Sequence, residues 1–308
     1  MKTFVAEEMP ELFRQIIKEK GWTDFFPEQP SDNVEIIIIR TKTVVDKLFL
    51  ERFPKLKLLI RAGTGFDNID IKEARKRNIQ VCNTPDANAL SAYEHTISFI
   101  FALLKQHRNA HQNLLQGKWK SGLNNNWEIS DLKALIVGVG RVGTRVAQSL
   151  KYFGAEVKGV DPYLFESDWI ERGILPIPYK EGLKWCNLIS FHCPLTHETK
   201  NYFDETTLDI LKNSSWLINT ARGGIVLQSA LKTGLEIGKL LGFAADVFSI
   251  EPPLKLEFSD FSNVILTPHI GSFTRKAKER LSEETLVVWK SFVFHNEILN
   301  PIENSFFL

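Results

Sequence analysis

The stretch "ALIVGVGRVG", residues 134–143, decides the fold of this chain. It opens with an apolar run that is typical of a buried strand and continues with Gly138, Gly140 and Gly143 in the pattern G-x-G-x-x-G. The first glycine permits a tight turn, the second leaves room for a pyrophosphate, and the third lets the following helix pack close to the strand. The N-terminus of that helix offers N–H groups to phosphate oxygens. The stretch therefore predicts a dinucleotide-binding βαβ unit.

An acidic residue completes this pattern. The next apolar run, "VKGVD" at 157–161, ends in Asp161. An acid at this place accepts hydrogen bonds from the ribose hydroxyls of the dinucleotide, although an acid before Pro162 is also a common turn residue. Because strand, glycine loop, helix and acid occur in the expected order, we favour the binding role. The negative charge of Asp161 would repel the 2′-phosphate of NADP, so the predicted cofactor is NAD.

Short apolar runs alternate with helical patterns on both sides of the glycine loop. This alternation predicts an α/β fold with parallel sheets built from βαβ units. The predicted strands are residues 34–40, 57–60, 134–138, 157–161, 188–192, 215–220, 242–247 and 263–268.

Composition excludes several classes of protein. The chain has 308 residues with 44% hydrophobic and 24% charged residues, which is typical of a soluble globular protein of two domains. A net charge of +1 gives no field for nucleic acid or for an anionic membrane. The start of the chain has acids where a signal peptide is apolar. Cys82, Cys186 and Cys193 form no disulfide or metal-binding pattern, so we expect a cytoplasmic protein without a metal.

Three segments place reactive side chains at or just after the ends of predicted strands. Arg222 lies in "NTARGGIV", Asp246 and Glu251 lie in "ADVFSIEPP", and His269 lies in "TPHIGS". Taken singly these are ordinary loop or capping residues. Because the carboxyl ends of parallel strands meet at one edge of a sheet, we expect them to lie close together. A His held by a carboxylate is a general acid–base pair, and an Arg beside it grips a substrate carboxylate.

These segments together resemble the D-isomer-specific 2-hydroxyacid dehydrogenases, and among them the phosphoglycerate dehydrogenases. The resemblance covers nearly the whole chain in order and spacing. It rests on "RTKT" (40–43), "RAGTGFDNID" (61–70), "NTPDANALSAYEH" (83–95), "GVGRVG" (138–143), "HCPLTHET" (192–199), "NTARGGIV" (219–226), "DVFSIEP" (246–252) and "TPHIG" (267–271).

The resemblance implies that a Rossmann NAD-binding domain, residues 93–272, is inserted into a smaller flavodoxin-like substrate-binding domain, residues 1–92 and 273–308, with the active site in the cleft between them. The helical segments 91–106 and 272–293 are then the two crossings. Ser91 and Glu94 match a capping box at the start of the first crossing. The resemblance also implies a homodimer built around the cofactor domain, with the helix near 91–116 contributing, and no nucleic-acid or membrane partner.

Roles follow from the resemblance, position by position. Arg222 is expected to hold the substrate carboxylate and the C2 oxygen, while His269 takes the hydroxyl proton as hydride leaves C2. Glu251 is expected to orient the imidazole and favour its protonated form. The implied cofactor-binding residues are Gly138, Gly140, Arg141, Val142, Gly143, Asp161, Cys193, Pro194, Thr220, Ala221 and Asp246, and the implied substrate loop is Ala62, Gly63 and Thr64.

The implied substrate is 3-phospho-D-glycerate, oxidised to 3-phosphohydroxypyruvate in serine biosynthesis. Its phosphate needs a cation of its own, and Arg40, Lys42 and Arg61 follow strands of the substrate domain. The alternatives are a glyoxylate or hydroxypyruvate reductase, another D-2-hydroxyacid dehydrogenase, and, in a different class, a dinucleotide-sensing protein that resembles a transcriptional corepressor.

The chain departs from the family's pattern in a few places. Leu227 stands where an acid is usual, and Phe273 is larger than the usual residue near the active site. We also expect no C-terminal regulatory domain, because the chain ends soon after the second crossing helix.

Overall fold

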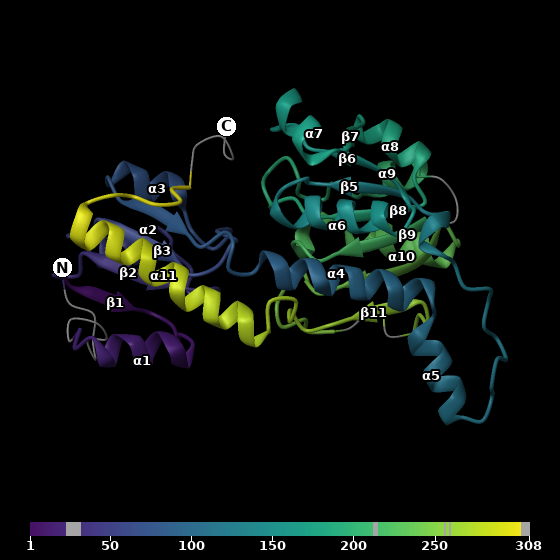
Figure 1. The fold of residues 1–308 in the computed structure, drawn as a ribbon, viewed down its shortest axis with the longest axis horizontal. Coiled ribbons are helices and arrows are strands. Elements are labelled where there is room, and N and C mark those ends of the chain that lie inside the picture. Colours follow the sequence, from purple (N-terminus) through teal and green to yellow (C-terminus); the bar gives the residue numbers. More distant parts are fainter. Residues whose placement is uncertain (23–31, 212–214, 256, 259, 303–308) are drawn as a thin grey trace. The chain divides into compact units, whose positions relative to one another are not determined.

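The computed structural model describes residues 1–22, 32–211, 215–255, 257–258 and 260–302. The chain divides into two compact units, Met1–Ser91 with Ser272–Leu308, and Ala92–Gly271 (Figure 1). Each unit holds a parallel sheet with helices packed on both faces, which confirms the predicted α/β class. The assignment of the first unit to substrate binding stays a prediction.

The first unit is built on a four-stranded sheet in the order β1-β2-β3-β4, in which all neighbours run parallel. Its strands are β1 (Thr3–Val5), β2 (Ile36–Ile39), β3 (Leu58–Arg61) and β4 (Gln80–Asn83). Because successive side chains of a strand point to opposite faces, Ile36 and Ile38 enter one core while Ile37 and Ile39 enter the other. The first core is covered by α1 (Glu11–Glu19) and α11 (Arg275–His295), and the second by α2 (Lys47–Glu51) and α3 (Ile71–Lys76).

The C-terminal helix α11 belongs to the same unit as the N-terminal strand. Its N-cap is Thr274, whose Oγ1 accepts a hydrogen bond of 3.1 Å from the Ala277 N–H. Buried residues such as Leu281 and Phe292 pack on the sheet. The indole N–H of Trp289 donates to Thr3 Oγ1 at 2.9 Å, which joins α11 directly to β1.

The second unit is built on a seven-stranded parallel sheet in the order β11-β10-β9-β8-β5-β6-β7. The chain starts in the middle of this sheet at β5, adds β6 and β7 on one side, and then adds β8 to β11 on the other. Ligands of such sheets bind at the carboxyl ends of the strands where the order reverses, here between β5 and β8. The strands are β5 (Lys133–Val137), β6 (Glu156–Val160), β7 (Leu175–Pro176), β8 (Leu188–Phe191), β9 (Ser215–Asn219), β10 (Leu240–Ala245) and β11 (Val264–Leu266).

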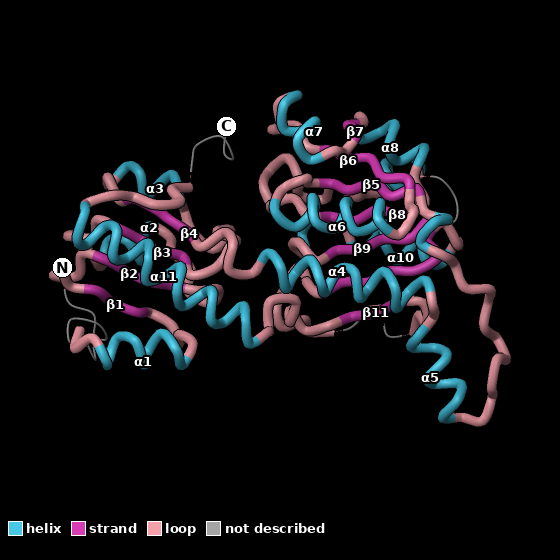
Figure 2. Tube along the Cα trace, viewed as in Figure 1, coloured by secondary structure: helices cyan, strands magenta, loops and turns pink. Residues whose placement is uncertain are grey.

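Helices cover both faces of this sheet (Figure 2). One face packs on α4 (Ala89–Leu104) and α6 (Arg141–Tyr152). The other packs on α8 (Tyr179–Trp185), α9 (Glu205–Ile210) and α10 (Gln228–Glu236). The remaining helices are α5 (His107–Leu115) and α7 (Glu166–Arg172), and two 3₁₀ turns span Ile129–Asp131 and Gly223–Ile225. Throughout the described ranges, each helix is too short or too polar to span a lipid bilayer.

All eight predicted strands are present, but the start of the first crossing helix was predicted wrongly. The helix begins at Ala89, so Ser91 lies inside it rather than at its cap. The Ser91 hydroxyl instead bonds to Thr274 Oγ1 at 2.8 Å and accepts from Arg280 at 3.3 Å, and these contacts leave it no capping role. The helical pattern near 91–116 is also divided into α4 and α5 at Gln106, which has a left-handed backbone with φ of 51°.

Candidate active site

The three glycines of the motif are required for different reasons. Gly138 has φ of 89°, and a Cβ there would lie 2.5 Å from the Cys193 backbone nitrogen. A Cβ on Gly143 would collide with the Gly138 carbonyl oxygen. Gly140 differs, because it is the N-cap of α6 and a Cβ there would meet nothing within 4 Å. Gly138 thus makes the turn, and Gly143 makes the close packing contact. Gly140 leaves an open space at the helix N-terminus, where a pyrophosphate can bind.

Asp161, the predicted ribose residue, and other predicted cofactor-binding residues lie around this loop. The two carboxylate oxygens of Asp161 accept hydrogen bonds from the Val139 N–H at 2.9 Å and the Tyr163 N–H at 3.2 Å. A carboxylate oxygen can accept more than one hydrogen bond, so Asp161 is held in place and can still accept from ribose hydroxyls. Cys193 and Pro194 follow β8, and Arg141 and Val142 open α6.

The reactive side chains named from the sequence follow three neighbouring strands. Arg222 follows β9, Glu251 follows β10 and His269 follows β11, and these strands are adjacent in the sheet. All three lie at the carboxyl edge because the strands are parallel.

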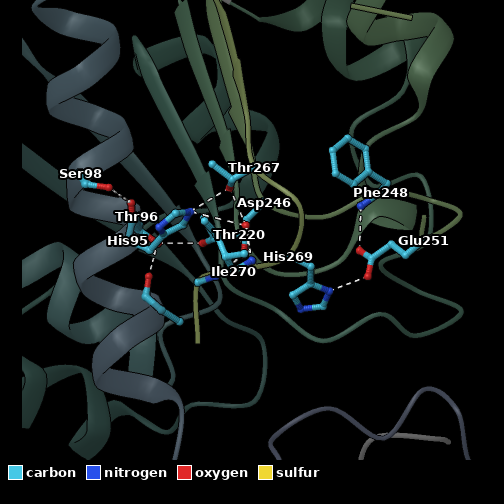
Figure 3. Close-up of polar contacts among 12 residues, drawn as sticks. His95, Thr96, Ser98, Thr220, Asp246, Phe248, Glu251, Thr267, His269 and Ile270 are labelled. Carbon is cyan, nitrogen blue, oxygen red and sulfur yellow. Dashed lines mark hydrogen bonds and ion pairs between the residues drawn. The ribbon is translucent and has the colours of Figure 1, made fainter. Parts of the chain in front are cut away.

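His269 and Glu251 form a close hydrogen-bonded pair (Figure 3). His269 Nδ1 lies 2.5 Å from Glu251 Oε2, and the other carboxylate oxygen accepts from the Phe248 N–H at 2.9 Å. Burial alone would raise the pKa of Glu251, but the hydrogen bonds from His269 and Phe248 and the charges of His269 and Arg222 lower it overall. Glu251 is therefore a carboxylate at neutral pH, and the imidazole presents its Nε2 away from that partner. The His269 backbone is left-handed, with φ of 53°.

The loop that carries Arg222 is held by a buried asparagine. Asn219 Nδ2 donates to the Arg222 carbonyl oxygen at 2.9 Å, and Asn219 Oδ1 accepts from the Ala221 N–H at 3.1 Å. Gly223 permits close packing, because a Cβ there would collide with the backbone of Phe248. The loops that carry Arg222 and Glu251 therefore touch, in accord with the influence of the Arg222 charge on the pKa of Glu251.

Asp246 is almost fully buried, with 2% of its surface exposed, and its oxygens hold the loop around His269. Oδ1 accepts from Thr267 Oγ1 at 2.5 Å and from the Ile270 N–H at 2.8 Å, and Oδ2 accepts from the Gly271 N–H at 2.6 Å. Burial raises the pKa of Asp246, but the hydrogen bonds from His95, Thr267 and the two backbone N–H groups lower it overall. The role of Asp246 in binding the cofactor stays a prediction.

Four polar residues at this edge were given no role by the sequence. Asn219 lies in "NTARGGIV" and Thr267 lies in "TPHIG", but the predicted roles in these motifs went to Arg222 and His269. His95 and Thr96 lie on α4, and their side chains reach Thr267 and Thr220 respectively (Figure 3). Their signal in the sequence is weak, because α4 also carries Ser91, Glu94 and Ser98 among its apolar residues.

The predicted substrate loop lies in the first unit, between β3 and β4. The Gly63 N–H donates to Thr84 Oγ1 at 2.6 Å, and Thr64 Oγ1 donates to the Pro85 carbonyl at 3.4 Å. Ala62 is 2% exposed. Arg61 is 5% exposed, and its guanidinium folds back over Gly63, where a Cβ would collide with it.

The predicted phosphate residues Arg40 and Lys42 follow β2. Glu7 binds the backbone of this segment, accepting from the N–H groups of Arg40 at 2.8 Å, Lys42 at 3.1 Å and Thr43 at 2.9 Å. The Arg40 guanidinium donates to the Glu8 carbonyl at 3.1 Å, and Lys42 is exposed.

The glycine loop, the His269–Glu251 pair and the Arg222 loop lie at the carboxyl edge of one parallel sheet, which places the second unit among the dinucleotide-binding domains of α/β fold. The family model described as "D-isomer specific 2-hydroxyacid dehydrogenase, NAD binding domain" matches residues 97–271. The chain belongs to this family, and the predicted NAD-binding Rossmann domain is confirmed.

Individual relatives agree with this assignment. The chain is 36% identical to D-3-phosphoglycerate dehydrogenase of Bacillus subtilis (strain 168) over 297 residues, covering 89% of this chain and 57% of the relative. It is 35% identical to the Homo sapiens protein of the same name over 300 residues, covering 95% and 56%. The chain therefore spans little more than half the length of these relatives. Among solved structures, D-lactate dehydrogenase from Aquifex aeolicus complexed with NAD and lactic acid has a TM-score of 0.86 and 28% identity, covering 98% of this chain and 99% of that one.

Proposed function

We propose that this chain is an NAD-dependent dehydrogenase that interconverts a D-2-hydroxy acid and its 2-keto acid. The observation that carries the proposal is the 2.5 Å contact between His269 and Glu251 next to the Arg222 loop, at the carboxyl edge of an NAD-binding sheet. This arrangement supplies a proton acceptor, a group that orients it, and a cation for the substrate carboxylate.

The residues of the second unit fit NAD. The open space at Gly140 and the N-terminus of α6 suit the pyrophosphate, and Asp161 suits the adenosine ribose. When bound, NAD would accept the hydride from C2 of the hydroxy acid. The carboxylate of Asp161 disfavours a 2′-phosphate by like-charge repulsion, so we propose a preference for NAD over NADP.

The chain's own residues would perform the proton chemistry. Arg222 would hold the substrate carboxylate and C2 oxygen through its planar guanidinium. His269 would take the C2 hydroxyl proton at Nε2, because Nδ1 is bonded to Glu251. Glu251, which stays ionised, would stabilise the imidazolium that forms and keep the ring in place.

The substrate that we propose is 3-phospho-D-glycerate, which would place the enzyme in serine biosynthesis. Two relatives with the name D-3-phosphoglycerate dehydrogenase support this choice. Arg40 and Lys42 would then bind the phosphate at the far end of the substrate.

One observation favours a second candidate, an unphosphorylated D-2-hydroxy or 2-keto acid such as lactate, glyoxylate or hydroxypyruvate. Arg61, proposed as part of the phosphate site, is buried with its guanidinium folded over its own loop. In that conformation Arg61 lies over Gly63, so two of the three predicted cations, Arg40 and Lys42, would form the phosphate site. A substrate without a phosphate needs neither of them.

The test is a substrate panel of 3-phosphoglycerate, D-glycerate, D-lactate, glyoxylate and hydroxypyruvate with both nicotinamide cofactors, read by nicotinamide absorbance. Arg40→Ala should raise KM for 3-phosphoglycerate at least about tenfold, on the order of 1.4 kcal/mol, and leave D-glycerate unaffected. Lys47→Ala is the matched control, because Lys47 is an exposed cation elsewhere in the same unit. Equal effects on phosphorylated and plain substrates would favour the second candidate.

We also propose a cytoplasmic homodimer. The three cysteines are free thiols, which suits a reducing compartment. In Figure 2, α5 and the loop after it extend away from the seven-stranded sheet, and no residue of α5 is buried. The exposed apolar side chains of this segment, Leu114, Leu115 and Trp119, suit a contact with a second copy.

A further inference from the structure

We propose that His95 and Thr96 of α4 are positioning residues, which hold the loops carrying His269 and Arg222 in their reactive arrangement. These two neighbours on one helix reach the loop after β11 and the loop after β9. Neither touches the His269–Glu251 pair directly, so their effect passes through other side chains. The kinetic part of this inference rests on the proposed dehydrogenase function.

His95 begins a chain of hydrogen bonds that ends at the His269 loop (Figure 3). His95 Nε2 lies 3.0 Å from Thr267 Oγ1, and the Thr267 hydroxyl donates to Asp246 Oδ1 at 2.5 Å. A hydroxyl has a single hydrogen, and Thr267 gives its hydrogen to Asp246. The hydrogen between His95 and Thr267 therefore belongs to His95 Nε2, which acts as the donor.

Asp246 connects this chain of hydrogen bonds to the backbone that follows His269. Its oxygens accept from the Ile270 and Gly271 N–H groups, while Thr267 is bonded on the near side. His269 itself has a left-handed backbone, with φ of 53°, which is uncommon for a residue with a Cβ. The network anchors the loop both before and after His269, so it fixes the direction in which the imidazole points.

Thr96 makes the corresponding contact with the Arg222 loop. Its hydroxyl donates to the Ala92 carbonyl at 2.8 Å and lies 2.8 Å from Thr220 Oγ1. Because the Thr96 hydrogen is used within the helix, Thr220 is the donor of the second bond. Thr220 directly follows β9 and precedes Arg222 by two positions, so α4 ties both catalytic loops to a single rigid element.

Packing also fixes the His95 ring. The ring makes an edge contact with Phe99 on the same helix, with centroids 4.4 Å apart. The contact with Phe99 and the hydrogen bond to Thr267 together leave the His95 ring little rotational freedom.

The experiment compares variants that remove or keep each hydrogen bond. His95→Leu and Thr96→Val remove the bonds, whereas His95→Gln keeps a donor at a similar reach and Thr96→Ser keeps the hydroxyl. Ser98→Ala is the matched control, because the Ser98 hydroxyl is exposed and, among the residues that the structure describes, donates to the His95 carbonyl of its own helix. Each variant is assayed for kcat, KM, NAD affinity, melting temperature, and amide hydrogen exchange of peptides covering 264–273 and 228–236.

His95→Leu is expected to lower kcat roughly 10- to 100-fold, as misplacement of a catalytic group does, with NAD affinity within about twofold of the wild type. Exchange should rise in peptide 264–273 but not in 228–236. His95→Gln and Thr96→Ser should recover most of the activity. The inference is overturned if His95→Leu leaves kcat and exchange unchanged, if His95→Gln is no better than His95→Leu, or if all losses follow melting temperature. A further outcome separates the two proposals. If the wild type oxidises none of the hydroxy acids but His95→Leu still raises exchange in peptide 264–273, the positioning role is supported and the proposed function is refuted.

Discussion

His269 combines an accessible imidazole with a constrained backbone. Its side chain is 36% exposed, so substrate can reach it, while φ of 53° and the neighbouring bonds to Asp246 fix its loop. His269→Ala should lower kcat by about two to four orders of magnitude, because a general acid–base contributes that much. NAD affinity, measured by titration of intrinsic fluorescence, should stay close to that of the wild type. A variant that loses NAD binding to the same degree as kcat would contradict an acid–base role.

Asp246 should make the stability of the fold depend on pH. Its pKa in the folded chain lies below the ordinary value of 3.8, so its charged form stabilises the fold above pH 3.8, and this contribution is lost as the pH falls through the lower folded value. Asp246→Asn should destabilise the protein by about 2–4 kcal/mol at pH 7, since hydrogen bonds to a buried charge are lost. The difference from the wild type should shrink at pH 3 and below.

Urea unfolding at a series of pH values measures this effect. Asp209→Asn serves as the control, because that side chain is 85% exposed. A difference between Asp246→Asn and the wild type that stays constant from pH 7 to pH 3 would rule out the charged hydrogen-bond network as its cause.

Sequence motifs predicted the contact between His269 and Glu251 but not the residues that hold their loops. His269 and Glu251 were predicted to pair, and the structure brings them to 2.5 Å, because both follow strands whose parallel order the sequence indicated. His95 could not be assigned in this way. Its partners Thr267 and Asp246 are distant in sequence, and only the packing of α4 on the sheet brings them together.

At the scale of elements, the segment after β2 depends on an acidic residue that follows β1. Glu7 accepts three backbone hydrogen bonds from residues 40, 42 and 43, and although burial raises its pKa, these bonds lower it overall. Glu7→Ala leaves three N–H groups without their acceptor and should lower the free energy of unfolding by about 1–3 kcal/mol. Glu7→Gln, which keeps one acceptor oxygen, should cost less.

Chemical denaturation and hydrogen exchange of residues 36–46 measure this effect. Glu8→Ala is the control, since its side chain is 84% exposed. Equal stability of Glu7→Ala and Glu8→Ala would show that the backbone contacts of Glu7 contribute nothing to the fold.

The strands that sequence reasoning missed share a physical cause. β1 has three residues, β4 reads Gln-Val-Cys-Asn, and β7 has two exposed residues, one of them Pro176. None of these gives an apolar run long enough to stand out. They form because a neighbouring strand supplies the hydrogen bonds, so the sequence of the segment alone does not predict them.

At the scale of the whole molecule, assembly should depend on α5. A pair of glutamates at Leu114 and Leu115 would place charges on an apolar surface that a second copy is proposed to cover. Light scattering at micromolar concentration should show a dimer for the wild type and a monomer for Leu114→Glu with Leu115→Glu. Leu254→Glu, at a side chain that is 94% exposed outside this segment, should stay dimeric. A monomeric wild type would refute the proposed homodimer.

The division of the chain into units could be anticipated only by resemblance. Periodicity and composition predicted the α/β class, but they could not predict that α11 packs with β1 and β2 across nearly the full length of the sequence. Such contacts depend on which apolar faces match in three dimensions. The predicted division into two domains therefore came from the order of the motifs, which resembles that of a known family.

The four isoleucines of β2 also matter before the chain folds. In the native unit β1 and β3 pair with both edges of this strand and helices cover both faces, but in the unfolded chain a run of β-branched apolar residues is prone to aggregate. Glu35 and Arg40 flank the run, and charges in these positions oppose self-association. Arg40 would thus act in the unfolded ensemble as well as at the proposed phosphate site, so its removal should reduce refolding yield as protein concentration rises, whichever substrate the folded enzyme takes.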